Sequence, residues 1–250
     1  MPTAARAAPP ASPEEREPLS ANGRRALLRT VSHELRTPLN AIIGFSDILS
    51  CELYGPLGSD QYREYAAIIR DSGHKLLKLV NDILEVARLE GGAAHLIVRE
   101  EPLRQAVEEA VQACRLEAAA GDVRIVVDEP EGLPMVMGDA RGLRTIFFNL
   151  FQRAVAASAP GSEIRVSAVG GCGRRRGWVH VEVRDASGPV DPALLDVMAE
   201  PFQAPDHEGS GSDLGLPIVR LLTEALGGEF ELKPTSQGLC AVVRLRACEG

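Results

Sequence analysis

Residues 32–43, which read SHELRTPLNAII, decide how the N-terminal part of this chain folds and which chemistry it carries. His33 is followed directly by the carboxylate Glu34, and Thr37 lies one helical turn further on. Because residues three and four apart share a helix face, His33, Arg36 and Thr37 project together. We expect the Glu34 carboxylate to accept the Nδ1 proton of His33, which leaves Nε2 as the nucleophile. The string indicates phosphoryl chemistry on an imidazole, and the alternative is an exposed histidine on a charged helix face.

Apolar residues around and after this string recur in alternating steps of three and four, which is the spacing of helices packed in a bundle. The first seam consists of Leu28, Val31, Leu35, Pro38, Ile42, Phe45 and Leu49, and the second of Tyr62, Tyr65, Ile69, Ser72, Leu76, Leu79, Ile83 and Val86. Two such helices joined by YGPLG form a hairpin with too much apolar surface to stand alone. This predicts a homodimeric, antiparallel four-helix bundle. The alternative is a hairpin packed on the C-terminal part of its own chain.

After residue 92 the pattern changes to mixed strands and helices, which predicts an α/β two-layer sandwich over residues 93–250. The expected strands cover 123–128, 163–169, 177–185, 229–233 and 239–247, and the expected helices cover 102–119, 140–157, 191–199 and 214–226. Residues 1–21 are rich in Pro, Ala and Glu and poor in large apolar groups, which favours a disordered tail. The predicted fold is therefore α+β, with a tail, a hairpin over 22–92 and the sandwich.

Composition and charge limit the classes of partner and of site. The formal net charge of −8 argues against binding to nucleic acid, because such proteins present a basic face. The five cysteines are scattered without metal-type spacing, so we expect free thiols and no metal site. No apolar run approaches the ~20 residues that span a bilayer, and the N-terminus lacks the core of a signal peptide. We expect a cytoplasmic protein without a membrane span.

The string around His33 resembles the H-box of two-component histidine kinases. Residues 52–92, which begin ELYGPLGSDQY and end EVARLEGG, resemble the turn and second helix of the same phosphoacceptor domain. The resemblance implies that His33 accepts a phosphoryl group, that Glu34 serves as its base, and that Thr37 positions water to dephosphorylate a regulator. It also implies a homodimer and the receiver domain of a response regulator as partners. Because the segment before Asn22 is too short for a sensory module, we expect input from a separate sensor protein or kinase.

The order of elements after residue 93 resembles the ATP-binding domain of the same family, in which helices pack on one face of a sheet. Its first nucleotide motif is recognisable but altered. In the segment NLFQRAVAAS, Asn149 matches the first Asn of the family pattern NLLxNAxK. Arg153 stands where the family has the Asn that ligates Mg²⁺, and Ala156 stands where it has a lysine. Arginine has no acceptor atom and cannot ligate a metal ion.

The second nucleotide motif of the family reads close to DxGxG, in which the Asp receives the adenine amino group. Asp185 matches that residue, but Ser187 and Pro189 replace the two glycines. Pro189 has a fixed φ and no N–H group to donate. Gly188 lies one position away from the pattern and can serve only if the loop shifts by one residue.

The third motif is the glycine-rich phosphate loop that precedes a helix. In the segment GSGSDLGLPIV, Gly211 and Gly215 fit this loop, whereas Asp213 replaces its second glycine. A helix N-terminus binds anions through its free N–H groups. An Asp just before the helix tends to accept from the same groups as an N-cap. We therefore expect Asp213 to compete with the phosphates.

These substitutions all weaken nucleotide binding, whereas the hairpin that carries His33 shows no departure from the family pattern. We predict a histidine-kinase-family protein whose phosphoacceptor exchanges phosphate with a response regulator, or drives its dephosphorylation. ATP-dependent autophosphorylation is expected to be impaired, with ATP and Mg²⁺ bound weakly or not at all. The alternatives are an active autokinase that tolerates the substitutions, and a non-enzymatic scaffold that binds a response regulator or another kinase.

Overall fold

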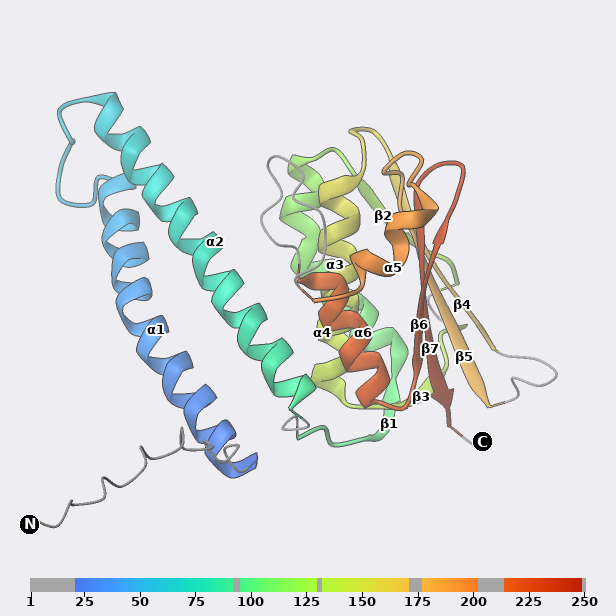
Figure 1. Ribbon diagram of the computed structural model, residues 1–250. Coiled ribbons are helices and arrows are strands. Elements are labelled where there is room, and N and C mark those ends of the chain that lie inside the picture. The colour runs from blue at the N-terminus through green and yellow to red at the C-terminus, as the bar shows by residue number, and fades with distance from the viewer. Residues whose placement is uncertain (1–20, 92–94, 130–131, 171–176, 202–213, 249–250) are drawn as a thin grey trace, which may run out of the picture.

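The computed structural model describes residues 21–91, 95–129, 132–170, 177–201 and 214–248. A helical hairpin comes first, and a sheet with helices on one face follows it (Figure 1). This arrangement confirms the predicted α+β fold of the single chain. The disordered tail predicted for residues 1–21 lies outside the described residues, apart from Ala21.

The hairpin consists of α1 (Ala21–Ser50) and α2 (Asp60–Glu90), which run antiparallel (Figure 1). Helix α2 begins after Ser59, whose side chain accepts a hydrogen bond from the N–H of Gln61 at 3.3 Å. This N-cap satisfies one of the donors that a helix start leaves free. The chain leaves the helix at Gly91, which is its C-cap residue.

The two helices contact each other through a row of side chains that differs from the predicted seams. The row consists of Leu39, Ile43 and Ser46 on α1 and of Ala66, Gly73 and Leu84 on α2, all of which are buried. A Cβ atom at Gly73 would lie 2.8 Å from Cγ1 of Ile43, so the close approach of the helices depends on a glycine.

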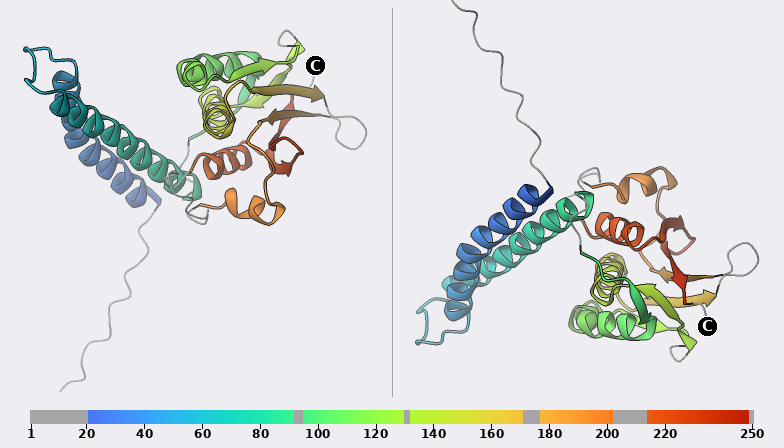
Figure 2. Two further views of the ribbon diagram at one scale, coloured as in Figure 1. Left: turned by 90° about the horizontal axis from the view of Figure 1, so that it is seen from above. Right: turned by 90° about the horizontal axis from the view of Figure 1, so that it is seen from below.

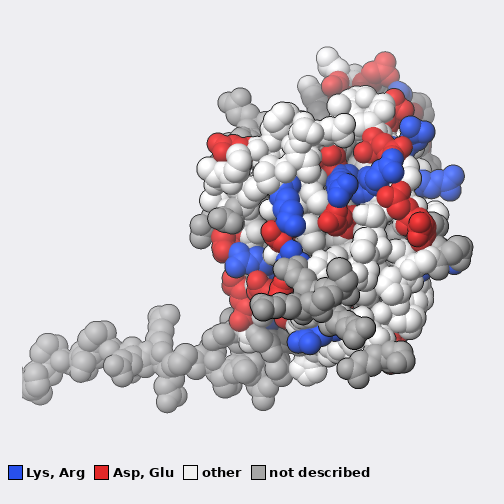
Figure 3. All heavy atoms as spheres, turned by 90° about the vertical axis from the view of Figure 1, so that its right-hand side faces the viewer, with Lys and Arg blue, Asp and Glu red and all other residues white. Residues whose placement is uncertain are grey.

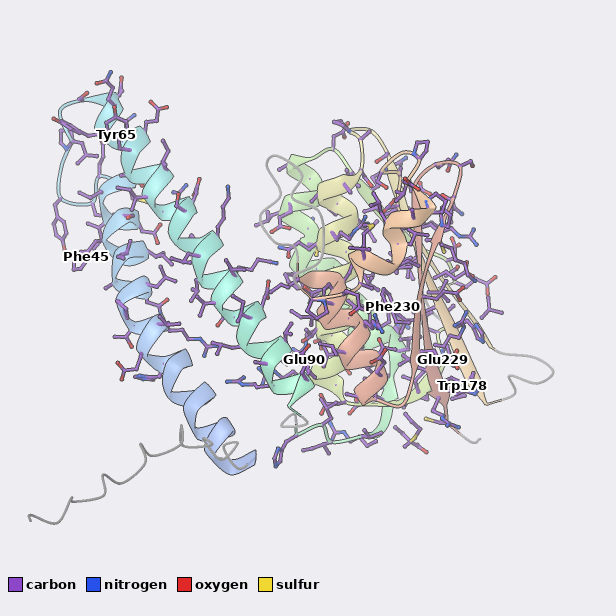
Figure 4. All side chains as sticks on the ribbon, in the orientation of Figure 1. Phe45, Tyr65, Glu90, Trp178, Glu229 and Phe230 are labelled. Atoms are coloured by element: carbon purple, nitrogen blue, oxygen red, sulfur yellow. The ribbon has the colours of Figure 1, made fainter. Side chains whose placement is uncertain are left out.

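Most of the predicted seam residues form an exposed apolar stripe along the hairpin. These residues are 39–68 % exposed, and they are Leu35, Ile42, Phe45 and Leu49 on α1 and Tyr62, Tyr65, Ile69, Leu76 and Ile83 on α2. Phe45 lies on the side of the hairpin that faces away from the sheet (Figure 4). This stripe therefore remains free for contacts outside this chain, and the side chains of Leu28 and Val31 lie outside the described residues.

The C-terminal end of α2 packs on the rest of the chain, which corrects part of the second seam. Val86 is 1 % exposed and joins the core of the α/β domain together with Leu89, while Leu79 packs against that core. Val86 and Leu79 are therefore not available to a second copy, because the α/β domain covers this end of α2. The alternative of a hairpin packed on its own chain applies to this end only.

The α/β domain contains one seven-stranded sheet with the order β1-β3-β7-β5-β4-β2, and β6 also pairs with β7. Among the described strands, β2 and β4 form a parallel pair and the other pairs are antiparallel. The strands are β1 (Arg99–Pro102), β2 (Arg124–Val127), β3 (Met135–Gly138), β4 (Glu163–Gly170), β5 (Trp178–Arg184), β6 (Glu229–Pro234) and β7 (Leu239–Ala247).

The main helices of this domain, α3 (Leu103–Ala120), α4 (Ala140–Ala157) and α6 (Gly215–Ala225), cover one face of the sheet (Figure 2). Alternate residues of the strands point into this layer, and Phe147 and Phe151 of α4 fill its centre with 0 % exposure. Helix α6 also receives the end of α2, so the helix layer lies between the hairpin and the sheet (Figure 1).

The structure corrects the predicted elements at two places. The four-residue strands β1 and β3 were not expected, because REEP and MVMG are too short for a clear alternation of apolar and polar residues. The helix expected over 191–199 is a 3-10 turn, η3 (Pro192–Leu194), followed by the short α5 (Leu195–Met198).

The other face of the sheet carries basic and acidic side chains that lie intermixed (Figure 3). Arg244 on β7 is 8 % exposed and pairs with Glu229 and Glu231 on the neighbouring strand. Phe230 lies between these two glutamates on β6 and packs against the core, because successive side chains of a strand point to opposite faces (Figure 4). Oppositely charged side chains on this face of the sheet therefore pair with one another.

Three further properties concern the described residues. No helix among them is long and apolar enough to cross a membrane. The four cysteines in this part of the chain are free thiols, and burial raises the pKa of the Cys114 thiol to about 11. No cluster of three or more His, Cys, Asp or Glu residues suited to a metal ion occurs among them.

We expect Leu89→Ala to lower the free energy of unfolding by about 2–5 kcal/mol, because it opens a cavity where α2 enters the core. Leu116→Ala is the matched control, since Leu116 is 84 % exposed and its change should stay within about 0.5 kcal/mol. Urea denaturation followed by circular dichroism measures both. Equal effects of the two substitutions would contradict the packing of α2 on the domain.

Candidate functional site

The candidate site on the hairpin lies on the exposed surface of α1. His33, Glu34 and Thr37 are all exposed. The Thr37 hydroxyl donates to the backbone carbonyl of His33 at 3.0 Å, which holds it on the same side of the helix as His33. Helix α1 continues through Pro38, although the proline nitrogen cannot donate to the carbonyl of Glu34. The reactive string is therefore an uninterrupted helical surface that a protein partner can reach.

The hydrogen bond predicted between His33 and Glu34 does not form in the structure. Within the described residues, neither side chain donates to or accepts from the other, since adjacent residues on a helix do not face each other. A change of rotamer at the exposed Glu34 side chain would be needed to bring its carboxylate to Nδ1.

Arg36 links the reactive string to the second helix of the hairpin. Its Nε and Nη2 atoms both donate to Oδ1 of Asn81 on α2, at 2.9 and 2.7 Å. Asn81 was not predicted as a site residue, because a polar residue on an exposed helix face carries no distinguishing pattern. The pair lies one helical turn from His33.

The second candidate site is centred on Asp185, which follows β5 and is 6 % exposed. Its Oδ2 atom accepts a hydrogen bond from Nη1 of Arg153 on α4 at 2.8 Å, which forms a buried ion pair. Its Oδ1 atom accepts from the hydroxyl of Ser187 and from the backbone N–H of Leu239, both at 2.7 Å. The N–H of Ser187 also donates to Oδ1, at 3.2 Å. Both carboxylate oxygens are therefore occupied by donors of the same chain.

The turn between β6 and β7 closes over Asp185. A Cβ atom at Gly238 would lie 2.3 Å from Oδ1 of Asp185, so only glycine fits at this position. The cavity that remains between Arg153, Asp185 and Leu216 measures about 10 Å³, which is roughly the space of one water molecule. Gly238 is a site residue that the motif comparison missed, because its role follows from close backbone approach.

Asn149 and Gly188, two further predicted nucleotide residues, each donate a hydrogen bond within this chain. Asn149 is 7 % exposed, and its Nδ2 atom donates to the carbonyl of Thr145 within its own helix at 2.8 Å. Gly188 has φ +84°, a conformation that favours glycine, and its N–H donates to the carbonyl of Gln237 at 2.9 Å. The role predicted for Gly188 after a one-residue shift of the loop stays a prediction.

The phosphate-loop residues are only partly described. Gly215 is the first residue of α6 and is buried, while Gly211 and Asp213 lie outside the described residues. The N-cap position of α6 is Leu214, one residue later than expected, and no side chain of that residue caps the helix. The role predicted for Asp213 therefore stays a prediction.

Two protein families match this chain. Residues 23–92 match the His Kinase A (phospho-acceptor) domain, and residues 138–248 match the Histidine kinase-, DNA gyrase B-, and HSP90-like ATPase family. The chain belongs to the two-component histidine kinase family. His33 lies in the first matched region, and Arg153 and Asp185 lie in the second.

Individual histidine kinases resemble this family member over most of its length. The chain is 32 % identical over 225 residues to the Cell-division control histidine kinase PdhS of Brucella suis and of Brucella abortus, which covers 85 % of this chain. It spans only 21 % of the length of PdhS.

Solved histidine kinase structures show the same fold. Full-length ShkA in complex with AMPPNP has a TM-score of 0.72 and 29 % identity, and the match covers 90 % of this chain and 47 % of ShkA. The histidine kinase AdeS of Acinetobacter baumannii has a TM-score of 0.61 and 16 % identity, over 87 % of this chain and 98 % of AdeS. The second likeness concerns the fold alone.

We expect Arg153→Met to lower the free energy of unfolding by about 3–5 kcal/mol, because it leaves the buried Asp185 carboxylate without its cation. Adding Asp185→Asn removes the charge and keeps an acceptor oxygen, so the double variant should recover much of the loss. Urea denaturation of the two single variants and the double variant completes a mutant cycle. Strictly additive losses would show that the two side chains do not interact.

Proposed function

We propose that this protein transfers phosphoryl groups between His33 and the receiver domain of a response regulator, or drives dephosphorylation of that regulator. In the same proposal, ATP-dependent autophosphorylation is impaired. The observation that carries it is the buried Arg153–Asp185 ion pair in the ATPase-type domain, beside a hairpin whose H-box is complete. The hairpin residues suit phosphoryl transfer on histidine, whereas the residues around Asp185 suit nucleotide binding poorly.

The nucleotide side of the proposal follows from the hydrogen bonds of Asp185. An adenine amino group needs a free acceptor, yet Arg153, Ser187 and Leu239 already donate to this carboxylate. An adenine amino group would have to share Oδ2 with the guanidinium of Arg153 or displace a donor from Oδ1, and displacement removes a partner of a buried charge. Among the described residues, the cavity directly beside the ion pair measures about 10 Å³, which is roughly the space of one water molecule.

The metal side of the proposal follows from Arg153. A guanidinium group offers five N–H donors and no acceptor, so it cannot ligate Mg²⁺. A divalent ion about 4 Å from this cation would be repelled by roughly 8 kcal/mol at an effective dielectric constant of 20. The residues present therefore do not fit a nucleotide–Mg²⁺ complex, and we assign no reaction step to one.

The hairpin side of the proposal rests on access and position. His33 and Thr37 are exposed on one continuous helix, so a receiver domain can bring its aspartate to them. Phosphoryl transfer depends mainly on positioning and electrostatic stabilisation. Thr37 can position water for in-line attack on an aspartyl phosphate, and Glu34 can serve as the base of His33 after a change of rotamer.

The same proposal includes a homodimer built from the exposed apolar stripe of α1 and α2. Burying such a stripe against its copy forms a four-helix bundle. The stripe runs along the length of both helices and ends where the α/β domain covers α2. A soluble monomer would leave this apolar surface in water, which favours association.

An active autokinase is the second candidate. It is supported by the left-handed φ of Gly188, which meets the backbone demand of the motif, and by ShkA, whose structure is described as a complex with AMPPNP. A third candidate, a non-enzymatic scaffold for a regulator or kinase, applies if neither ATP nor a phosphorylated regulator reacts with His33.

We expect weak ATP binding with little dependence on Mg²⁺ in calorimetric titrations of the intact chain. Arg153→Asn combined with Asp213→Gly should strengthen binding more than either substitution alone, because one relieves the metal position and the other the phosphate loop. Tight micromolar binding by the unaltered chain that is lost on chelation would favour the autokinase. No gain in the double variant would indicate that the turn at Gly238 closes the site by itself.

We expect the intact chain to be a dimer at micromolar concentration, and Leu76→Glu to dissociate it by placing an unpaired charge in the stripe. His74→Glu is the matched control, since His74 is also exposed but lies two residues from Leu76, about 200° around α2. Light scattering measures the mass of each variant. A monomeric unaltered chain, or dissociation by both substitutions, would contradict the proposed interface.

We expect His33→Ala to abolish phosphate exchange with a co-encoded phosphorylated regulator. Thr37→Ala should slow dephosphorylation of the regulator while sparing transfer to His33, and Thr37→Ser should restore it because the hydroxyl is kept. Gel mobility and the lifetime of the phosphorylated regulator measure both steps. If neither alanine variant changes that lifetime, the bundle is a docking surface and the scaffold replaces this proposal.

A further inference from the structure

Arg36 is held in a fixed orientation beside His33. Its position three residues after His33 places the two Cβ atoms about 5–6 Å apart on one helix face. Two N–H groups, on Nε and Nη2, donate to Oδ1 of Asn81 at 2.9 and 2.7 Å. A guanidinium has five N–H donors, so both donors of Nη1 and one of Nη2 remain available. The hydrogen bonds to Asn81 on α2 therefore orient the Arg36 guanidinium and leave three of its N–H donors available.

The charge of Arg36 is not compensated by this contact. Asn81 is a neutral acceptor, and no carboxylate of the described residues lies within ion-pair distance of Arg36. Two other arginines among the described residues of the hairpin pair with carboxylates. Arg70 contacts Asp71 at 3.0 Å and Asp47 at 4.0 Å, and Arg63 contacts Glu52 at 3.1 Å. Arg36 thus presents a full positive charge next to the histidine.

We propose that Arg36 binds the phosphoryl group carried by His33, and that Asn81 is the residue that positions Arg36 for this contact. The inference rests on the proposed phosphoacceptor function of His33. A phosphoryl group in transfer spreads negative charge over its equatorial oxygens, and the planar fork of arginine matches such oxygens with two parallel hydrogen bonds. A neutral partner such as Asn81 orients the fork while leaving its charge for the phosphate.

Phosphoramidate tests this without ATP or a regulator. In the reaction the P–N bond of phosphoramidate breaks and a bond forms between phosphorus and Nε2 of His33. Ammonia leaves with the electron pair of the broken bond and takes up the proton that the imidazole releases, which gives ammonium. The intact chain is labelled and followed by ³¹P NMR, which reports the labelling rate and, through the chemical shift, the pKa of the bound phosphoryl group.

Arg36→Gln should slow labelling by about tenfold, in line with loss of a charge-assisted hydrogen bond, and should raise the pKa of the phosphoryl group. Arg36→Lys should recover part of the labelling rate and of the phosphoryl pKa, since lysine keeps the charge but lacks the planar guanidinium that makes two parallel hydrogen bonds. Arg70→Gln is the matched control on the same hairpin and should label at the unaltered rate. Circular dichroism checks that the variants remain helical.

Asn81→Asp distinguishes two roles of Arg36, the binding of phosphate through its charge and the linking of α1 to α2. The aspartate keeps an acceptor for Arg36 but neutralises it, so our proposal expects slow labelling and a raised phosphoryl pKa. If Arg36 only ties α1 to α2, this variant should label like the unaltered chain, and that result would overturn the inference. If His33→Ala is still labelled, or the unaltered chain takes no label, the phosphoacceptor proposal itself fails.

Discussion

The hairpin has more apolar surface than its two helices can bury against each other, and this constraint organises the rest of the molecule. One row of small and apolar residues, with Gly73 against Ile43, closes the hairpin. A second group at the end of α2, Val86 and Leu89, enters the core of the α/β domain and fixes the two parts to each other. What remains is the exposed stripe. It runs along a face of the helices that neither the partner helix nor the domain covers.

The nucleotide site is governed by a different kind of constraint, the need of a buried carboxylate for partners. Asp185 lies under a turn that only glycine permits, and a charge in that place requires donors. Arg153 supplies the counter-charge from α4. Because removal of either partner leaves the other charge buried and unpaired, each of the two side chains depends on the other.

Much of this could be predicted from the sequence, and the failures have physical causes. Seam spacing located both helices, but it could not tell the intrachain row from the exposed stripe, because both follow the same period. Arg153 and Asp185 were each singled out by motif, yet their ion pair depends on how α4 packs beside β5. Gly238 and Asn81 carry no local signal, since their roles arise from backbone approach and from a contact across helices. The short strands β1 and β3 are defined by pairing more than by propensity.

The nucleotide site and the histidine site respond differently to substitutions because they depend on different groups. Nucleotide binding needs free acceptors, free helix N–H groups and an open cavity, and one arginine that pairs with Asp185 removes an acceptor and fills space at once. The proposed phosphoacceptor site needs an exposed nucleophile and an oriented positive charge, and the hairpin carries an exposed His33 and an Arg36 that donates to Asn81. No contact of the hairpin string passes through Asp185. A change at Arg153 or Asp185 therefore leaves these contacts of the hairpin in place, and the packing of Val86 and Leu89 in the core of the α/β domain involves neither residue.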